Sequence, residues 1–365
     1  MGERTKISFA HRTFSPWVGC TKVSPGCLHC YAEVSTPARA FGVEWGPGKE
    51  RRRTKDWSGP QRWNRTPWFC SACEKFSALE PHPGTGCLHC GAVDTRDRTR
   101  VFFSLGDPWD AEVPVATRLD FFRLIFLTPA LDWLLFTKRI VDAHRLLREA
   151  AMAVDTAGGN PWSKRLGEAF MFWLHMWAEG KSAPSNVWSI VTMESRDIAL
   201  DGTIGHGRFR ALAQFPAVVR GISAEPLLGP VLPPFQNAPG AIHWIIFGGE
   251  SHRDRKAARL CVHEWIESGM RHAGLNGVAV FVKQFGSRAL VENANLYDWP
   301  KGVKLAHGKI EKGAGTGFAS AEVLYRHPKG GDPEEWPECF KVFQVPAGVP
   351  TEARGVDYST LVRLG

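Results

Sequence analysis

The chain has 365 residues, of which 44% are hydrophobic and 22% are charged. These proportions are typical of a globular protein with a sizeable core, and they exclude a largely disordered chain. The formal net charge of +8 favours polyanionic partners such as DNA, RNA or a nucleotide, because Lys and Arg neutralise phosphates, although many basic proteins bind no such partner.

The first fifteen residues, MGERTKISFAHRTFS, contain no apolar core of the kind found in signal peptides. No segment offers the roughly 18 apolar residues that a membrane-spanning helix needs. We therefore expect a cytoplasmic protein with no membrane partner. In that reducing compartment, clustered cysteines indicate metal or redox chemistry more often than structural disulfides.

A first strand is expected near ISFAHRTFS, and it leads into GCTKVSPGCLHCYA, which we call the three-cysteine loop (residues 19–32). Its Gly, Pro and Ser content predicts irregular structure, and its thiols are Cys20, Cys27 and Cys30. Three thiolates on a [4Fe-4S] cluster leave one iron open to bind a cofactor or a substrate. A structural zinc site would need a fourth ligand, which His29 or His11 could supply. An incidental group of thiols is the third interpretation.

The second cysteine group consists of two C-x-x-C pairs separated by the polar segment EKFSALEPHPGTG: Cys70, Cys73, Cys87 and Cys90. Four thiolates with no open position are typical of a structural tetrahedral zinc site, although the spacing does not exclude iron, and two disulfides are the alternative. We interpret residues 57–97 as an inserted zinc-ribbon-like module. Its basic, Trp-rich entry is suited either to stacking on nucleic-acid bases or to packing on the ribbon.

Further along the chain, strand-like segments alternate with helix-like ones. The expected strands are 99–107, 131–139, 185–195, 217–226, 241–251 and 278–286, and an amphipathic helix is expected within 160–180. This alternation predicts an α/β fold with a parallel sheet, a full or partial TIM-like barrel, with a doubly wound sheet as the alternative. The barrel would comprise residues 1–56 and 98–295, followed by a C-terminal extension over 296–365.

Polar residues recur where the expected strands end. They are Asp107, Lys138, Arg139, Glu194, Glu225, Glu250 and Lys283. The carboxyl ends of parallel strands meet on one face, where such folds carry out their chemistry. Each residue alone could be a solvated turn residue, but their recurrence predicts a site.

The ordered motifs GCTKVSPGCLHCYA, FTKR, ISAEPLLGP, GGES and FVKQFG resemble a phage- and prophage-associated family of uncharacterised proteins. That family looks like a divergent branch of the radical S-adenosylmethionine superfamily, and the resemblance covers Lys6 to Cys30 and about 99–290. It implies a barrel of radical SAM type whose Cys20, Cys27 and Cys30 ligate a [4Fe-4S] cluster. It also implies that S-adenosylmethionine binds the open iron and is cleaved to a 5′-deoxyadenosyl radical, with electrons from a donor such as flavodoxin or ferredoxin.

The sequence departs from the superfamily pattern in three respects. The cysteines are separated by six and two residues instead of three and two. The position before the last cysteine, where the superfamily often has an aromatic residue against adenine, is His29, so Tyr31 is the candidate for that role. The Gly-Gly-Glu element that holds the methionine amine normally follows the second strand, whereas Gly248, Gly249 and Glu250 follow a late one, so Glu250 is a candidate by position.

Two functions remain at this stage. The first is a radical SAM enzyme that modifies or repairs a nucleic acid or nucleotide in the cytoplasm of a bacterium or a phage-infected host. In that scheme Glu194, Glu225 and Glu250 orient polar groups of cofactor or substrate, and Lys138, Arg139 and Lys283 hold anionic groups. The second is a non-catalytic, zinc-dependent nucleic-acid-binding protein. No residue is assigned a catalytic role in relaying the radical.

Overall fold

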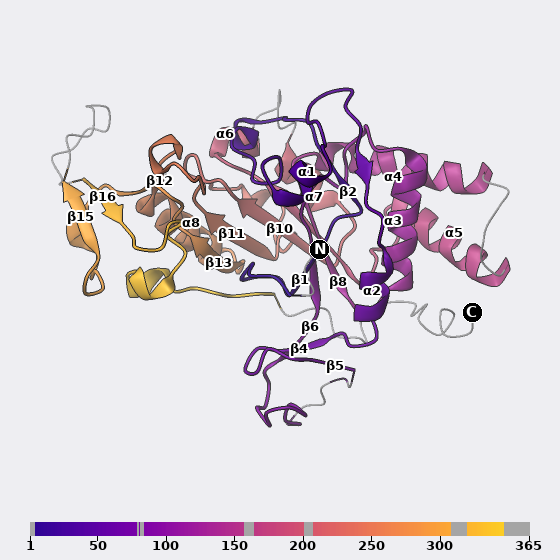
Figure 1. Cartoon of the computed structure of the whole chain (residues 1–365), viewed down its shortest axis with the longest axis horizontal. Helices are drawn as coiled ribbons and strands as arrows, with labels where there is room; N and C mark the ends of the chain where they lie inside the picture. Colours follow the sequence, from indigo (N-terminus) through magenta and orange to yellow (C-terminus); the bar gives the residue numbers. More distant parts are fainter. Residues whose placement is uncertain are drawn as a thin grey trace.

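The computed structural model of the chain describes residues 4–78, 80, 84–156, 164–200, 207–307 and 320–346. Its principal element is a sheet of seven strands, in which every neighbouring pair is parallel. In spatial order the strands are β1 (Arg12–Phe14), β7 (Arg100–Phe103), β8 (Asp132–Thr137), β9 (Val187–Thr192), β10 (Val219–Ala224), β11 (Trp244–Gly248) and β13 (Ala279–Gln284). The sheet curls into a half-barrel (Figure 1).

The spatial order of these strands follows the chain without a reversal. A doubly wound sheet must reverse its order, so that alternative is wrong. Because parallel crossovers have one hand, an unreversed order brings the connecting helices to one face. The α/β class and the partial barrel are confirmed, and each expected strand segment contains one of the seven strands.

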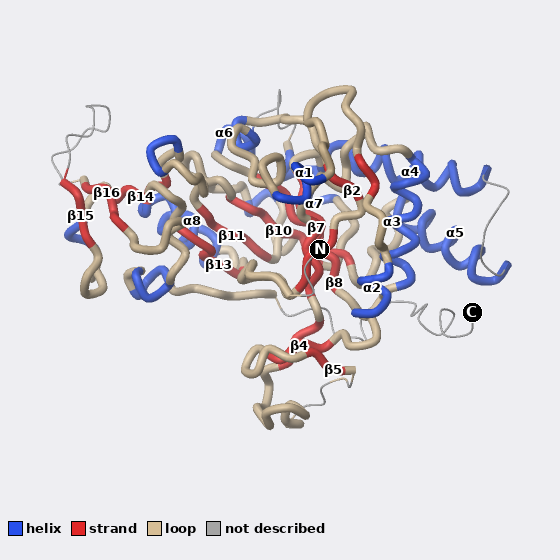
Figure 2. The backbone as a smooth tube through the Cα atoms, in the orientation of Figure 1, coloured by secondary structure: helices blue, strands red, loops and turns tan. Residues whose placement is uncertain are grey.

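The helices pack against the outer face of the half-barrel (Figure 2). The longer ones are α3 (Val115–Leu127), α4 (Ile140–Thr156), α5 (Lys164–Ala178), α7 (Arg208–Gln214) and α8 (His263–Leu275). The amphipathic helix expected within 160–180 is α5, and its apolar face is buried, with Phe170, Trp173, Leu174 and Trp177. Its expected start at 160–163 lies outside the described residues. None of the described helices is long and apolar enough to cross a membrane.

Aromatic side chains fill the concave face of the sheet. Phe9, which precedes β1, has its ring centroid 5.3 Å from that of Phe136 and 6.1 Å from that of Phe281. Trp188 and Trp244 complete this inner cluster, packed edge-on with their ring centroids 6.0 Å apart. Because this face is apolar and packed, polar side chains can gather only at the ends of the strands.

A second sheet joins residues on both sides of the expected boundary at 295/296. Its order is β12 (Cys261–Val262), β14 (Ala289–Val291), β16 (Ala321–Leu324) and β15 (Lys304–His307). Strand β14 pairs antiparallel with β16. Residues 342–344, near the end of the described chain, lie along β13, where Val282 N–H donates to the Val342 carbonyl at 2.8 Å. Residues 308–319 and 347–365 of the expected extension lie outside the described residues.

The four-cysteine group belongs to a small antiparallel sheet of β5 (Phe76–Ser77), β4 (Trp68–Cys70) and β6 (Arg96–Arg98). Since Thr99 alone separates β6 from β7, this sheet lies at the amino-terminal end of the half-barrel strands, at the bottom of Figure 1. His11 stacks on Phe69, with ring centroids 4.1 Å apart, and attaches the small sheet to β1.

The remaining elements are short. They are β2 (Trp17–Val18) paired with β3 (Arg52–Arg53), α1 (Thr36–Ala40), α2 (Ser58–Trp63), α6 (Arg196–Leu200) and the 3₁₀ helices η1 (Pro25–Cys27), η2 (Phe235–Asn237), η3 (Arg255–Ala257), η4 (Ala294–Leu296), η5 (Pro333–Glu335) and η6 (Glu338–Phe340).

Candidate functional site

The three-cysteine loop begins directly after β2, a few residues beyond the carboxyl end of β1, and runs over the ends of the parallel strands, above the sheet in Figure 1. The turn into it needs a glycine, because Gly19 has φ of +118°. The loop has little regular structure apart from η1, as expected. Its three cysteines are free thiols, each partly exposed.

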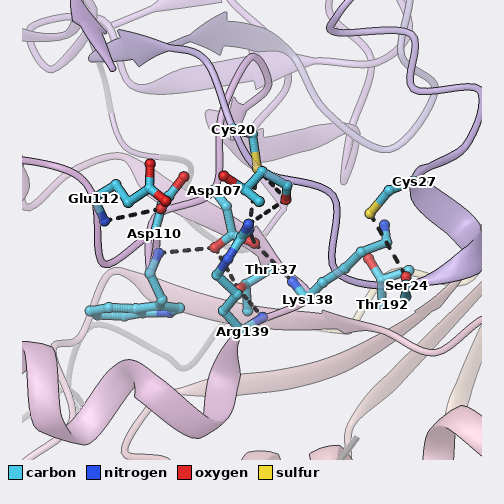
Figure 3. Close-up of polar contacts among 12 residues, drawn as sticks. Cys20, Ser24, Cys27, Asp107, Asp110, Glu112, Thr137, Lys138, Arg139 and Thr192 are labelled. Carbon is cyan, nitrogen blue, oxygen red and sulfur yellow. Dashed lines mark hydrogen bonds and ion pairs between the residues drawn. The ribbon is translucent and has the colours of Figure 1, made fainter. Parts of the chain in front are cut away.

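Cys20 accepts a hydrogen bond from an arginine that follows strand β8 (Figure 3). The Arg139 guanidinium, directly after β8, donates from Nη1 to Cys20 Sγ at 3.2 Å and to Asp107 Oδ2 at 3.1 Å. Asp107, after β7, also accepts the Lys138 N–H at 3.0 Å and the Thr137 hydroxyl at 2.6 Å. The strand ends thus form one network that holds a cation against the Cys20 sulfur.

The protonation of this network follows from its burial. Burial raises the pKa of the Cys20 thiol to about 12, against the opposing effect of the Arg139 charge. A metal ion would therefore have to displace a proton from this sulfur. Burial disfavours the Arg139 cation, but Asp107 and Cys20 outweigh it and raise the pKa of that guanidinium.

Glu194, which follows β9, is hydrogen-bonded to the middle of the loop, and we call a carboxylate that contacts the loop in this way a clamp. Its side chain is fully buried, and its Oε2 accepts from Arg208 Nη1 at 3.1 Å. Its Oε1 accepts the hydroxyl of Ser24 and lies 3.9 Å from Lys138 Nζ. A Cβ at Gly26 would overlap this carboxylate, so a glycine is required for the close approach. Because its oxygens are engaged by the loop and by Arg208, Glu194 supports the loop.

Glu250, which follows β11, is a second clamp. It accepts from the Arg259 N–H at 3.0 Å, from the Arg259 guanidinium, and from His29 Nδ1 at 2.9 Å. Arg259 also donates to the Pro25 carbonyl at 2.7 Å and so ties the clamp to η1. Burial acts to raise the pKa of Glu250, but the hydrogen bonds from Arg259 and His29 outweigh it and lower the pKa to about 2.

Glu225 and Lys283 form a separate ion pair at the ends of β10 and β13. Lys283 Nζ lies 2.8 Å from Glu225 Oε1, and Ser223 donates to Oε2 at 3.3 Å. Their side chains are 14% and 27% exposed, in contrast to the buried carboxylates of the two clamps. Among the described residues, this pair makes no hydrogen bond with the three-cysteine loop. It is thus more accessible to a ligand than Lys138 and Glu194, the other lysine and glutamate that lie close together at the strand ends.

Tyr31 lies at the end of the loop with its ring exposed. The residue is 56% exposed, and its hydroxyl donates to the Ser104 carbonyl at 2.8 Å. The ring lines a pocket of about 870 Å³ together with Cys30. An aromatic face fixed at one end and open at the other is suited to stacking on a planar ligand.

The four-cysteine group is a different kind of site. All four sulfur atoms lie within 4.8 Å of one another, and the Cys70–Cys90 and Cys73–Cys87 pairs are each 3.8 Å apart. This convergence fits four thiolates around one ion, so the group could hold a metal. Within the described parts of the chain, no other set of three or more Cys, His, Asp or Glu ligands converges as closely.

The structure thus gathers the sequence-predicted site residues at one end of the sheet, except for the four-cysteine group and His11, which lie at the other end. Sequence reasoning missed the partners that engage them: Ser24, Arg208 and Arg259. Ser24 could have been suspected from its position between two ligand candidates. The two arginines gave no such signal, because Arg210 lies beside Arg208 in α7, and Arg253 and Arg255 lie close to Arg259 in the chain.

Comparison with known proteins identifies a family. The model of a family described as "Protein of unknown function (DUF5131)" matches residues 4–316. No curated protein and no solved structure matches the chain. The matched residues include both cysteine groups and all seven strands of the half-barrel.

Proposed function

The chain belongs to this DUF5131 family of proteins of unknown function, and we propose that it is a radical S-adenosylmethionine enzyme with a [4Fe-4S] cluster on Cys20, Cys27 and Cys30. The observation that carries the proposal is the loop itself. Three free thiols without a fourth cysteine lie over the carboxyl ends of a parallel half-barrel, where α/β folds bind their cofactors.

The residues at this site fit the cluster. Thiolates are the usual ligands of iron–sulfur clusters, and ligands on separate irons need not converge as closely as those around one ion. Arg139 supplies a donor to Cys20 Sγ, and Ser24 Oγ lies 3.8 Å from Cys27 Sγ. When bound, the cluster would pass one electron from a donor such as flavodoxin or ferredoxin to S-adenosylmethionine, whose sulfonium cleavage gives methionine and a 5′-deoxyadenosyl radical that abstracts hydrogen from substrate.

The neighbouring residues divide into two roles. Glu194, Glu250 and Lys138 belong to the networks that hold the loop and would position the ligands. Glu225 and Lys283 offer a carboxylate and an ammonium, which complement the amine and carboxylate of the methionine moiety. Tyr31 offers its exposed ring to the adenine or to a substrate base.

The substrate we propose is a nucleic acid or a nucleotide. The net charge of +8 supports this class, since phosphate neutralisation dominates such binding. We assign zinc to the four-cysteine group, which would make residues 57–97 a zinc-ribbon-like module inserted in a barrel of radical SAM type. The compartment we propose is the cytoplasm of a bacterium or phage-infected host, in keeping with the resemblance to phage-associated proteins.

The alternative, a non-catalytic protein with two zinc ions, needs a fourth ligand at the first group. His29 donates its Nδ1–H to Glu250, and His11 lies against Phe69 at the other end of the sheet, where its Nδ1 accepts the Arg100 N–H at 3.0 Å. Burial, assisted by the Arg100 charge, lowers the pKa of His11 to about 2. The position of His11 excludes it as a ligand of the first group, whereas the bond from His29 Nδ1–H to Glu250 leaves Nε2 of His29 free to bind a metal. The observation that favours the cluster is that, among the described residues, the loop cysteines and His29 do not converge around one point as the four-cysteine group does.

The test is anaerobic purification with metal analysis, followed by an assay for 5′-deoxyadenosine with reductant, with and without DNA. We expect iron and sulfide for one cluster, one zinc, and reductant-dependent cleavage of S-adenosylmethionine. Two zinc ions with no sulfide would replace this function with the alternative.

A further inference from the structure

A pocket of about 870 Å³ lies between the three-cysteine loop and the second sheet. One wall comprises loop residues, among them Cys30 and Tyr31, and the opposite wall comprises the end of β16 and residues 325–329. The segment after β11 and the turn at Ser287 form its base. The volume falls in the range of small-molecule and cofactor sites, and the pocket reaches a proposed cluster ligand directly.

The lining is rich in cations: Arg39, Arg253, Arg255 and Lys329. Its one acidic residue, Glu33, lies 3.0 Å from Lys22 Nζ and is thereby neutralised. Arg255 forms an ion pair with Glu322, in which Nη2 lies 3.2 Å from Oε1. Across the described parts of the chain, no carboxylate within ion-pair distance compensates the other three cations. The pocket therefore carries uncompensated positive charge.

A histidine adds a further N–H donor to this lining. His327 Nδ1 accepts the backbone N–H groups of Gly331 at 3.0 Å and Lys329 at 3.3 Å, which leaves the ring proton on Nε2 as a donor. His252 lies against His29, with ring centroids 4.7 Å apart. Guanidinium, ammonium and imidazole N–H donors around one cavity are the groups with which proteins bind phosphate.

The charge of the pocket separates two candidate occupants. S-adenosylmethionine carries a sulfonium and an ammonium against one carboxylate and is a net cation, so uncompensated Arg and Lys side chains repel it. A phosphate-bearing molecule is attracted. Tyr31, a residue that is 56% exposed beside these cations, provides an aromatic surface for base stacking.

We infer that this pocket binds the phosphate-bearing part of the substrate, either the 5′-phosphate of a nucleotide or the phosphodiester backbone of a strand, next to Cys30. The inference rests on the proposed function and names the site where its substrate is held. S-adenosylmethionine is assigned to the Glu225–Lys283 side of the loop, outside this lining.

The experiment measures binding by fluorescence anisotropy, with the reconstituted full-length protein under anaerobic conditions and without S-adenosylmethionine. The probes are a short fluorescein-labelled single-stranded DNA and a fluorescent AMP. Comparable affinity for both identifies a mononucleotide phosphate as sufficient, whereas binding of the strand alone identifies the phosphodiester backbone. Binding of neither probe would overturn the inference.

The variant is R253E/K329E, which reverses two exposed charges of the lining. We expect at least about tenfold weaker binding and a smaller dependence of affinity on salt, by about 0.7 in log–log slope for each phosphate that is no longer neutralised. The charge-preserving R253K/K329R should retain the affinity. The control R148E makes the same type of charge reversal at an exposed position of α4, outside the lining, and should stay within about twofold. Wild-type affinity in R253E/K329E would contradict the inference.

Assaying S-adenosylmethionine cleavage in parallel keeps the two proposals separate. A protein that cleaves the cofactor but binds neither probe overturns the pocket assignment alone. A protein that binds phosphate at this pocket but assembles no cluster overturns the radical enzyme and leaves a phosphate-binding site. Unchanged zinc content and far-ultraviolet circular dichroism exclude misfolding of the variants.

Discussion

The two cysteine groups lie at opposite ends of the same parallel sheet and are organised in opposite ways. The four sulfurs of Cys70, Cys73, Cys87 and Cys90 converge within 4.8 Å of one another in a small sheet of their own. The three-cysteine loop is instead held by side chains from several strand ends, notably Arg139, Glu194 and Glu250. In the proposed function the four-cysteine group is a closed metal site built by local turns, and the three-cysteine loop is an open one positioned by the strand ends.

The largest expected effect is on the open site. C30S should abolish cluster absorption and lower 5′-deoxyadenosine formation by more than about 100-fold, beyond what loss of a supporting group usually costs. The zinc content should remain. C339S, at an exposed cysteine outside both groups, is the matched control and should behave as wild type. An intact cluster in C30S would remove Cys30 from the ligand set.

The closed site should respond in the reverse manner. C73S should release zinc and unfold the small sheet, because a structural metal contributes folding free energy directly. Hydrogen exchange should show reduced protection in β4 and β6, while β8 to β11 stay protected. Cleavage of S-adenosylmethionine should stay within about threefold, since distant sites act independently. Loss of cleavage in C73S would show that the two ends are coupled.

A smaller effect is expected at the Arg139–Cys20 hydrogen bond. R139Q should lower the midpoint potential of the cluster, because a cationic donor to a ligand sulfur stabilises the more negative, reduced state. A hydrogen bond worth about 1.4 kcal/mol corresponds to about 60 mV for one electron. Spectroscopic redox titration measures this shift, and R145Q, on the exposed face of α4, should leave the potential unchanged. A potential equal to wild type in R139Q would exclude a tuning role.

The smallest effect concerns the acid stability of the loop clamp. The pKa of Glu250 is lowered to about 2, so its carboxylate contributes stability that is complete above about pH 4.5 and is lost as the pH falls towards 2. The contribution amounts to about 1.4 kcal/mol per pH unit in that window. Urea unfolding from pH 6 to 3 should show a shallower decline for E250Q than for wild type. Parallel declines would show that Glu250 is not engaged as described.

The strands and the ends of the sheet could be predicted because each strand is a short, apolar segment followed by a polar turn. The segment from Trp244 to Phe247 is an example. Glu250, which follows this strand, lies at the carboxyl end of the parallel sheet, where the strand pattern places it. The partners were not predictable. Glu194 meets Ser24 across 170 residues, and nothing in the local sequence of Arg208 or Arg259 distinguishes these arginines from exposed ones.

The second sheet also escaped sequence reasoning. Its strand β12 has two residues, and β16 follows a Gly-rich stretch without a clear pattern. The pocket wall at 325–329 depends on that sheet. Short strands are stabilised mainly by tertiary pairing, so their own residues carry little signal.

A half-barrel, unlike a closed barrel, leaves edge strands that can recruit other chains and aggregate. Here the edge at β13 is occupied: Val282 N–H donates to the Val342 carbonyl, and Gln344 N–H donates to the Val280 carbonyl, both at 2.8 Å. The last described segment therefore acts as a protective seal on the sheet. We expect a chain that ends before Val342 to expose the edge of β13 and to self-associate. A shortened chain should therefore keep residues 342–346.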